Sequence, residues 1–104
     1  MQRIAFTMQL NKGCEEEYKK RHTLIWPELQ QLLRETGISD YSIFLDPVSC
    51  ILFGVLKTTE PSALANLPEN PVMKKWWQYM ADIMVTNADN SPVQISLEEV
   101  FYLP

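Results

Sequence analysis

The sequence predicts an α+β fold in one domain that covers residues 1–104. Two observations carry this prediction. Four short apolar stretches have the length of strands, and in the first and last of them apolar and polar residues alternate. Two longer stretches carry apolar residues every three or four positions, as amphipathic helices do. In chain order these segments read β-α-β-β-α-β, the ferredoxin-like arrangement of two helices on one face of a four-stranded sheet.

Residues 3–10 form the first predicted strand, because Ile4 and Phe6 alternate with polar neighbours. A helix is expected to follow, capped by Asn11, with the acidic run 15–17 in its first turn, where the helix dipole favours negative charge. We expect it to end near residue 36, because Gly37 is a natural C-terminal stop. Pro27 removes one backbone donor inside this segment and predicts a kink or break near Trp26.

The second half of the chain begins with a predicted hairpin of strands 41–45 and 50–57, joined by a turn at Asp46-Pro47. Residues 60–71 contain three prolines and read as a loop with one short helical turn at 62–66. A helix over 71–84 follows, then a polar loop over 87–92. The last predicted strand covers 94–102, with a bulge at Glu98-Glu99.

The third predicted strand is apolar on both of its faces. Leu52 and Leu56 point to one side, while Ile51, Phe53 and Val55 point to the other. Two helices can cover only one face of the sheet, and an apolar face left open indicates an interaction site. We therefore expect a homodimer in which a second copy packs sheet to sheet.

Composition narrows the class of function. Nine Lys and Arg against 13 Asp and Glu give a net charge of −4, which argues against nucleic acid or an anionic membrane as partner. No apolar run approaches the length of a membrane span, and the first residues do not resemble a secretory signal. Two cysteines and one histidine form neither a disulfide framework nor a metal cluster. We expect a cytoplasmic, metal-free protein that acts on a small molecule.

His22 is the only histidine, and it shares one helical face with Tyr18, one turn earlier. An imidazole titrates close to neutral pH, so His22 is a candidate general acid or base in a pocket. Both residues have a plain structural alternative as hydrogen-bonded members of the core.

Aromatic residues are the other candidates for a binding site. Trp76 and Trp77 are adjacent on a helix and point about 100° apart, so they cannot both enter the same core. With Trp26 they suggest a sugar site, in which the ring faces of the sugar lie on indole, or else ordinary aromatic packing. Tyr41, at the start of the second strand, could point its hydroxyl into the same cavity.

The chain resembles the L-rhamnose mutarotase family over essentially its whole length. The resemblance is carried by EEYKKRHTLIWPEL at 16–29, YSIFLD at 41–46, WWQYMADIM at 76–84, NADNSPV at 87–93 and LEEVFYLP at 97–104. A Tyr-x-x-Arg-His segment followed by Ile-Trp-Pro-Glu, a Trp-Trp pair and a Phe-Tyr-Leu-Pro ending rarely coincide.

This resemblance implies a dimeric α+β barrel that interconverts the α and β anomers of L-rhamnose without cofactor or metal. It implies that His22 is the proton donor and that Tyr18, Tyr41, Trp76 and Trp77 bind the substrate. Two alternatives use the same architecture: a haem-degrading or cofactor-free monooxygenase, and a non-catalytic ligand-binding domain. Fold alone does not choose among these, whereas the motifs favour the mutarotase.

Overall fold

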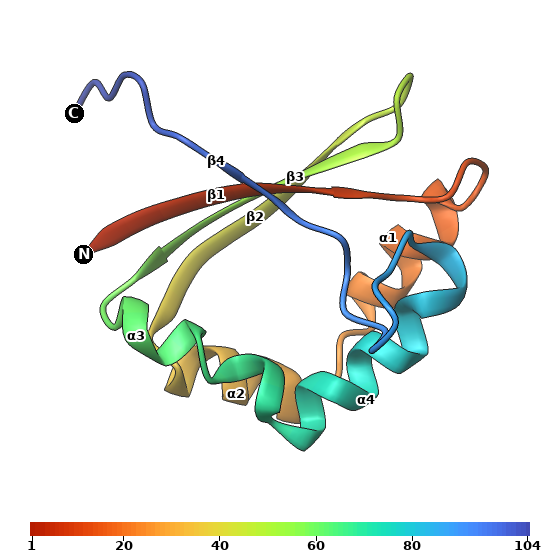
Figure 1. The fold of residues 1–104 in the computed structure, drawn as a ribbon, viewed down its shortest axis with the longest axis horizontal. Helices are drawn as coiled ribbons and strands as arrows, with labels where there is room; N and C mark the ends of the chain where they lie inside the picture. Colours follow the sequence, from red (N-terminus) through yellow and green to blue (C-terminus); the bar gives the residue numbers. More distant parts are fainter.

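The computed structural model describes residues 1–104 and confirms the α+β, ferredoxin-like prediction. The elements are β1 (Gln2–Gln9), α1 (Glu15–Thr23), α2 (Pro27–Glu35), β2 (Ile38–Asp46), β3 (Ile51–Thr58), α3 (Pro61–Leu64), α4 (Pro71–Met80) and β4 (Ile95–Leu97), with 3-10 turns η1 (Leu67–Glu69) and η2 (Ala81–Ile83). The helices lie on one side of the sheet, as Figure 1 shows. None of the helices has both the length and the apolar character needed to cross a membrane.

The sheet is antiparallel with strand order β2-β3-β1-β4. Its two central strands pair along their full length, from Gln2 opposite Thr58 to Gln9 opposite Ile51. This register places the even-numbered residues of β1 and β3 on the helix side of the sheet. On that side they meet buried residues of α2 and α4 in one core, which includes Phe6, Leu10, Leu29, Leu52, Leu56, Met73, Trp76 and Met80.

The predicted break in the first helical segment is present. Residue Trp26 has an extended backbone (ψ 134°), as a residue before proline should, and Pro27 then opens α2 as its first residue. Gly37 follows α2 with φ +92°, a conformation that glycine adopts at little cost. The predicted cap by Asn11 is wrong, because Cys14 is the N-cap of α1 and no side chain bonds its free backbone donors.

The last strand is much shorter than predicted. Pairing with β1 is confined to Ile95–Leu97, and residues 98–104 lie outside any helix or strand. There is accordingly no bulge at Glu98-Glu99. The tail runs past β1 (Figure 1), where Arg3 contacts Glu99 at 3.6 Å and the Tyr102 ring at 3.7 Å. β4 is an edge strand, so only β1 offers it backbone partners.

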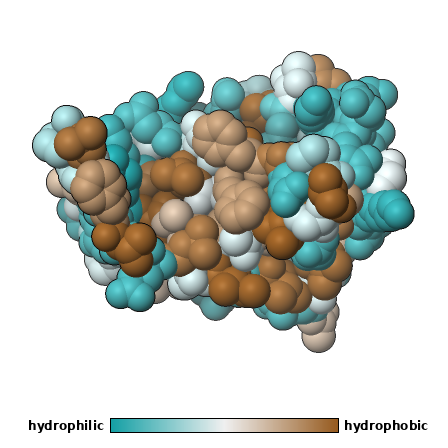
Figure 2. All heavy atoms as spheres, turned by 90° about the horizontal axis from the view of Figure 1, so that it is seen from above, coloured by the Kyte–Doolittle hydropathy of each residue, from teal (hydrophilic) through white to brown (hydrophobic).

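The outer face of the sheet is apolar and open, as expected from β3. Phe44 of β2 lies opposite Phe53 of β3, and the two are 63% and 36% exposed. On β4, Ile95 and Leu97 are 65% and 43% exposed. Figure 2 looks onto this face and shows hydrophobic side chains gathered over its middle.

Candidate active site

A cavity of about 1430 Å³ lies between the helices and the inner face of the sheet. Its lining includes every residue predicted for the site: Tyr18, His22, Tyr41, Trp76 and Trp77. These residues come from α1, β2 and α4, so the fold brings three distant segments of sequence around one space. The cavity is large enough for a monosaccharide.

His22 is held by contacts within its own helix and by one from α4. Its Nδ1 lies 3.1 Å from the carbonyl oxygen of Tyr18, and since a carbonyl can only accept, this nitrogen carries a hydrogen. Its ring stacks on that of Tyr18 at 4.2 Å and meets the Trp76 ring edge-on at 5.5 Å. The free Nε2 is therefore the atom that can exchange a proton with a ligand. Burial lowers the pKa of His22 below its ordinary value of 6.5, although the Tyr18 carbonyl opposes this.

The two tyrosines remain protonated over the physiological range. Burial, with a smaller effect of Tyr41, raises the pKa of Tyr18 well above its ordinary value. Tyr41 keeps 37% of its surface exposed, but it lines the cavity, its ring meets Phe6 at 6.2 Å, and burial raises its pKa to about 12. Each hydroxyl can donate one hydrogen bond and accept others, which suits contacts with sugar hydroxyls.

The two adjacent tryptophans occupy different environments, as the helical spacing predicted. Trp76 is 6% exposed and packs against Trp26 at 5.0 Å and Tyr79 at 5.7 Å. Trp77 is half-buried against the edge of the core and also lines the cavity. Trp76 thus belongs to a closed aromatic cluster beside His22, whereas Trp77 keeps an accessible surface.

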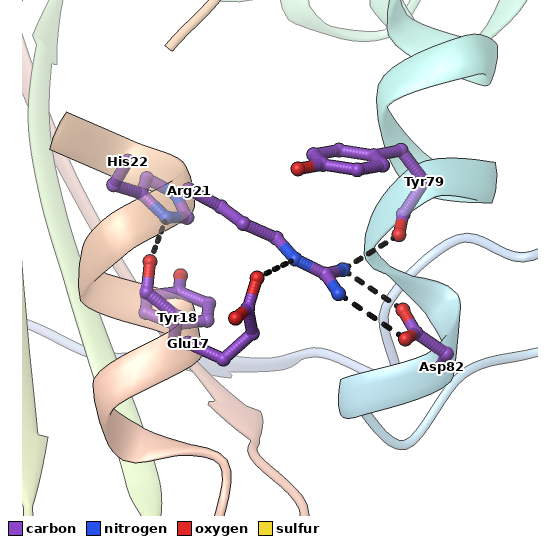
Figure 3. Close-up of polar contacts among 6 residues, drawn as sticks. All are labelled: Glu17, Tyr18, Arg21, His22, Tyr79 and Asp82. Carbon is purple, nitrogen blue, oxygen red and sulfur yellow. Dashed lines mark hydrogen bonds and ion pairs between the residues drawn. The ribbon is translucent and has the colours of Figure 1, made fainter. Parts of the chain in front are cut away.

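One polar group beside the site was missed from the sequence, from which no partner is predicted for Asp82. Asp82 instead pairs with Arg21, the residue before His22, at 2.8 Å, and Glu17 pairs with the same guanidinium at 2.8 Å (Figure 3). The spacing of four between Glu17 and Arg21 was a usable signal. Nothing local indicates Asp82, which is 61 residues away in the chain.

The chemistry available here is proton transfer to a small polar ligand. The cavity is lined by the imidazole of His22, the protonated phenols of Tyr18 and Tyr41, and the indoles of Trp76 and Trp77. No three side chains of His, Cys, Asp or Glu converge in a way that could hold a metal ion.

The chain is similar to known proteins over nearly its whole length. The family model for L-rhamnose mutarotase matches residues 3–103. An L-rhamnose mutarotase of Brucella anthropi is 58% identical over 103 residues, which cover 99% of this chain and 97% of the relative. One from Agrobacterium fabrum is 60% identical over 104 residues, covering 100% and 97%.

Solved structures extend the comparison to three dimensions. The crystal structure of an L-rhamnose mutarotase from Formosa agariphila superposes with a TM-score of 0.93 at 51% identity, covering 100% of both chains. A putative antibiotic biosynthesis monooxygenase from Nitrosomonas europaea has a TM-score of 0.62 at 15% identity, covering 97% of this chain and 100% of that one, and so shares the fold alone. The chain belongs to the L-rhamnose mutarotase family.

Proposed function

We propose that this protein interconverts the α and β anomers of L-rhamnose and that His22 is its proton donor. The isomerase activity follows from family membership across the whole chain. The observation that supports the role of His22 is its geometry: Nδ1 is occupied by a carbonyl within α1, and Nε2 is left for a ligand in the cavity.

The reaction needs one proton delivered and one removed. In ring opening, the protonated Nε2 of His22 gives its proton to the ring oxygen, and the bond from this oxygen to the anomeric carbon breaks. The electron pair of the anomeric O–H bond forms the aldehyde, and that proton leaves to water. Rotation about one carbon–carbon bond presents the other aldehyde face, and closure reverses both transfers. Little charge accumulates, so one positioned acid with a nearby acceptor suffices.

Tyr18, Tyr41, Trp76 and Trp77 form the proposed sugar-binding wall. The two hydroxyls bind sugar hydroxyls, while the indoles contact the C–H faces and the methyl group of the 6-deoxy sugar. The open face of Trp77 makes it the stronger candidate for direct stacking, since Trp76 is already enclosed by aromatic neighbours.

The test is magnetisation exchange between the two anomeric protons of L-rhamnose, measured by NMR. Wild-type protein should accelerate exchange over buffer, and folded His22→Ala should lose most of that acceleration. Lys20→Ala is the control, because Lys20 is exposed on the same helix and does not line the cavity. Exchange that survives in His22→Ala would reassign the acid, and no exchange with wild type would refute the activity. In that case a shifted Soret band on haem addition would favour the monooxygenase alternative.

The same proposal includes a homodimer formed through the outer face of the sheet. Exposed apolar residues there, above all the facing pair Phe44 and Phe53, support this assembly. Sedimentation at micromolar concentration should give a dimer for wild type and a monomer for Phe44→Glu. Val48→Glu, which adds the same charge at the exposed hairpin turn, should remain dimeric. A cytoplasmic location is also part of the proposal, and cell fractionation would test it.

A further inference from the structure

One guanidinium joins α1 to the end of α4. Arg21 Nη1 donates to Asp82 Oδ1 at 2.8 Å and to the Tyr79 carbonyl oxygen at 2.7 Å, while Nη2 donates to Asp82 Oδ2 at 3.2 Å. Its Nε donates to Glu17 at 2.8 Å. Figure 3 shows the side chain reaching from α1 across to Tyr79 and Asp82. We call Arg21 and Asp82, with these contacts, the Arg21 clamp.

The clamp is built more firmly than a surface ion pair. The Arg21 side chain is only 10% exposed, and two parallel N–H···O bonds join it to one carboxylate. The hydrogen bonds of Arg21 with Asp82 and Glu17 raise the pKa of Arg21. The hydrogen bond with Arg21 lowers the pKa of Asp82. The Asp82 side chain is 66% exposed, so the pair adds modestly to stability, and its two parallel bonds mainly fix the geometry between the two segments.

Apart from the hydrogen bond that Cys50 Sγ donates to Glu15 at 3.2 Å, helix α1 has little else that fixes its position. It has nine residues, of which only Tyr18 is buried, and it has no side-chain cap at its N-terminus. The ring of His22 is oriented within α1 by Tyr18, but its contact with Trp76 crosses to α4. The orientation of the His22 imidazole towards Trp76 therefore depends on how α1 packs against α4.

The clamp also contacts Tyr79, an aromatic residue that packs on Trp76. The guanidinium carbon lies 4.5 Å from the centre of the Tyr79 ring. Tyr79 packs on Trp76 at 5.7 Å, and Trp76 meets His22 at 5.5 Å. The Arg21 guanidinium thus bridges α1 and α4, and through Tyr79 it supports the Trp76 indole beside His22.

We propose that Arg21 is a positioning residue, which acts through Asp82 to hold α1 against α4 so that His22 faces a sugar bound at the tryptophan wall. This inference rests on the proposed role of His22. A misplacement of about 1 Å between an acid and its substrate can cost a hundredfold in rate. Loss of the clamp should therefore lower kcat while leaving KM nearly unchanged, because three of the four residues proposed to bind the sugar, Tyr41, Trp76 and Trp77, lie outside α1.

The experiment compares Asp82→Asn with Glu69→Gln in the anomer-exchange assay, at a temperature where circular dichroism shows both variants folded. Asp82 is suited to this because its side chain is 66% exposed, so asparagine fits there without a clash. Glu69 is the matched control: it pairs with Lys74 of α4 at 4.0 Å and does not line the main cavity. We expect kcat to fall roughly tenfold or more in Asp82→Asn, with KM within about twofold of wild type, and no change in Glu69→Gln.

A second comparison separates positioning from general stabilisation. If the clamp acts through His22, adding Asp82→Asn to His22→Ala should cause no further loss of the residual rate. A further loss equal to that seen in wild type, or an unchanged kcat in Asp82→Asn, would overturn the inference. Should Asp82→Asn not fold, Arg21→Lys takes its place, because lysine keeps the charge but cannot bind Asp82 through two parallel bonds. Wild-type protein without activity would instead refute the proposed function itself.

Discussion

Replacing each tryptophan of α4 by alanine should harm the protein in different ways. Trp76 is 6% exposed and contacts the rings of Trp26, His22 and Tyr79 at 5.0, 5.5 and 5.7 Å. Removal of such a buried indole costs about 3–5 kcal/mol of unfolding free energy. Trp77 is half-buried, so we expect roughly half that cost.

Ligand binding should show the reverse order. If Trp77 stacks on the sugar, its loss removes an aromatic contact of about 0.5–1.5 kcal/mol, which corresponds to a KM about two- to tenfold higher. Trp76→Phe keeps an aromatic ring in the closed cluster, so its KM should stay near that of wild type. The phenylalanine variant is needed because a chain of this length has only about 5–15 kcal/mol of total stability, and Trp76→Ala removes a large share.

Urea unfolding at one fixed protein concentration measures the stability terms, and anomer exchange at several L-rhamnose concentrations measures KM. The concentration must be fixed because association would add to the apparent stability. Equal losses of stability in the two alanine variants would refute the distinction between an enclosed and an open indole. A KM that rises in Trp76→Phe but not in Trp77→Ala would assign the stacking contact to Trp76.

Four further predictions concern His22, Gly54 and Asn70. Burial lowers the pKa of His22 below 6.5. If His22 is the acid, kcat/KM should fall as pH rises through that pKa, and His22→Ala should show no such inflection. A kcat/KM that rises over the same pH interval would make His22 the base. Because the pKa of His22 is lower in the folded protein, the unfolded chain binds more protons below pH 6.5. The free energy of unfolding in urea should therefore decrease more in the wild type than in His22→Ala as pH falls below 6.5. Gly54→Ala would place a Cβ 2.5 Å from Phe6 Cζ, so we expect a loss of about 1–3 kcal/mol in urea unfolding; an unchanged midpoint would show that the ring moves freely. Asn70→Ala removes the 2.9 Å cap of α4 and should cost about 1 kcal/mol, measured as a lower thermal midpoint; no change would mean that the cap is dispensable.

Much of the candidate site was predictable because its residues carry local signals. The spacing of four between Tyr18 and His22 places both on one helical face, and α1 does present them to one cavity. The adjacency of Trp76 and Trp77 required two environments, and the structure shows one enclosed and one open indole. The position of Tyr41 is harder to predict from the sequence, because Tyr41 lies within the register shift between Ser39 and Ser42.

The sequence by itself determined the element order, the break before Pro27, the stop at Gly37 and the two-sided apolar character of β3. Each depends on one residue's backbone preference or on periodicity within a few positions, so neighbours in sequence suffice. Only the tertiary structure decided the length of β4 and the pairing of Arg21 with Asp82. β4 pairs only with Ala5–Thr7 although β1 continues to Gln2, so the point where this edge strand leaves the sheet depends on its contacts with the rest of the fold. An ion pair across 61 residues likewise exists only once the two segments that carry it have packed together.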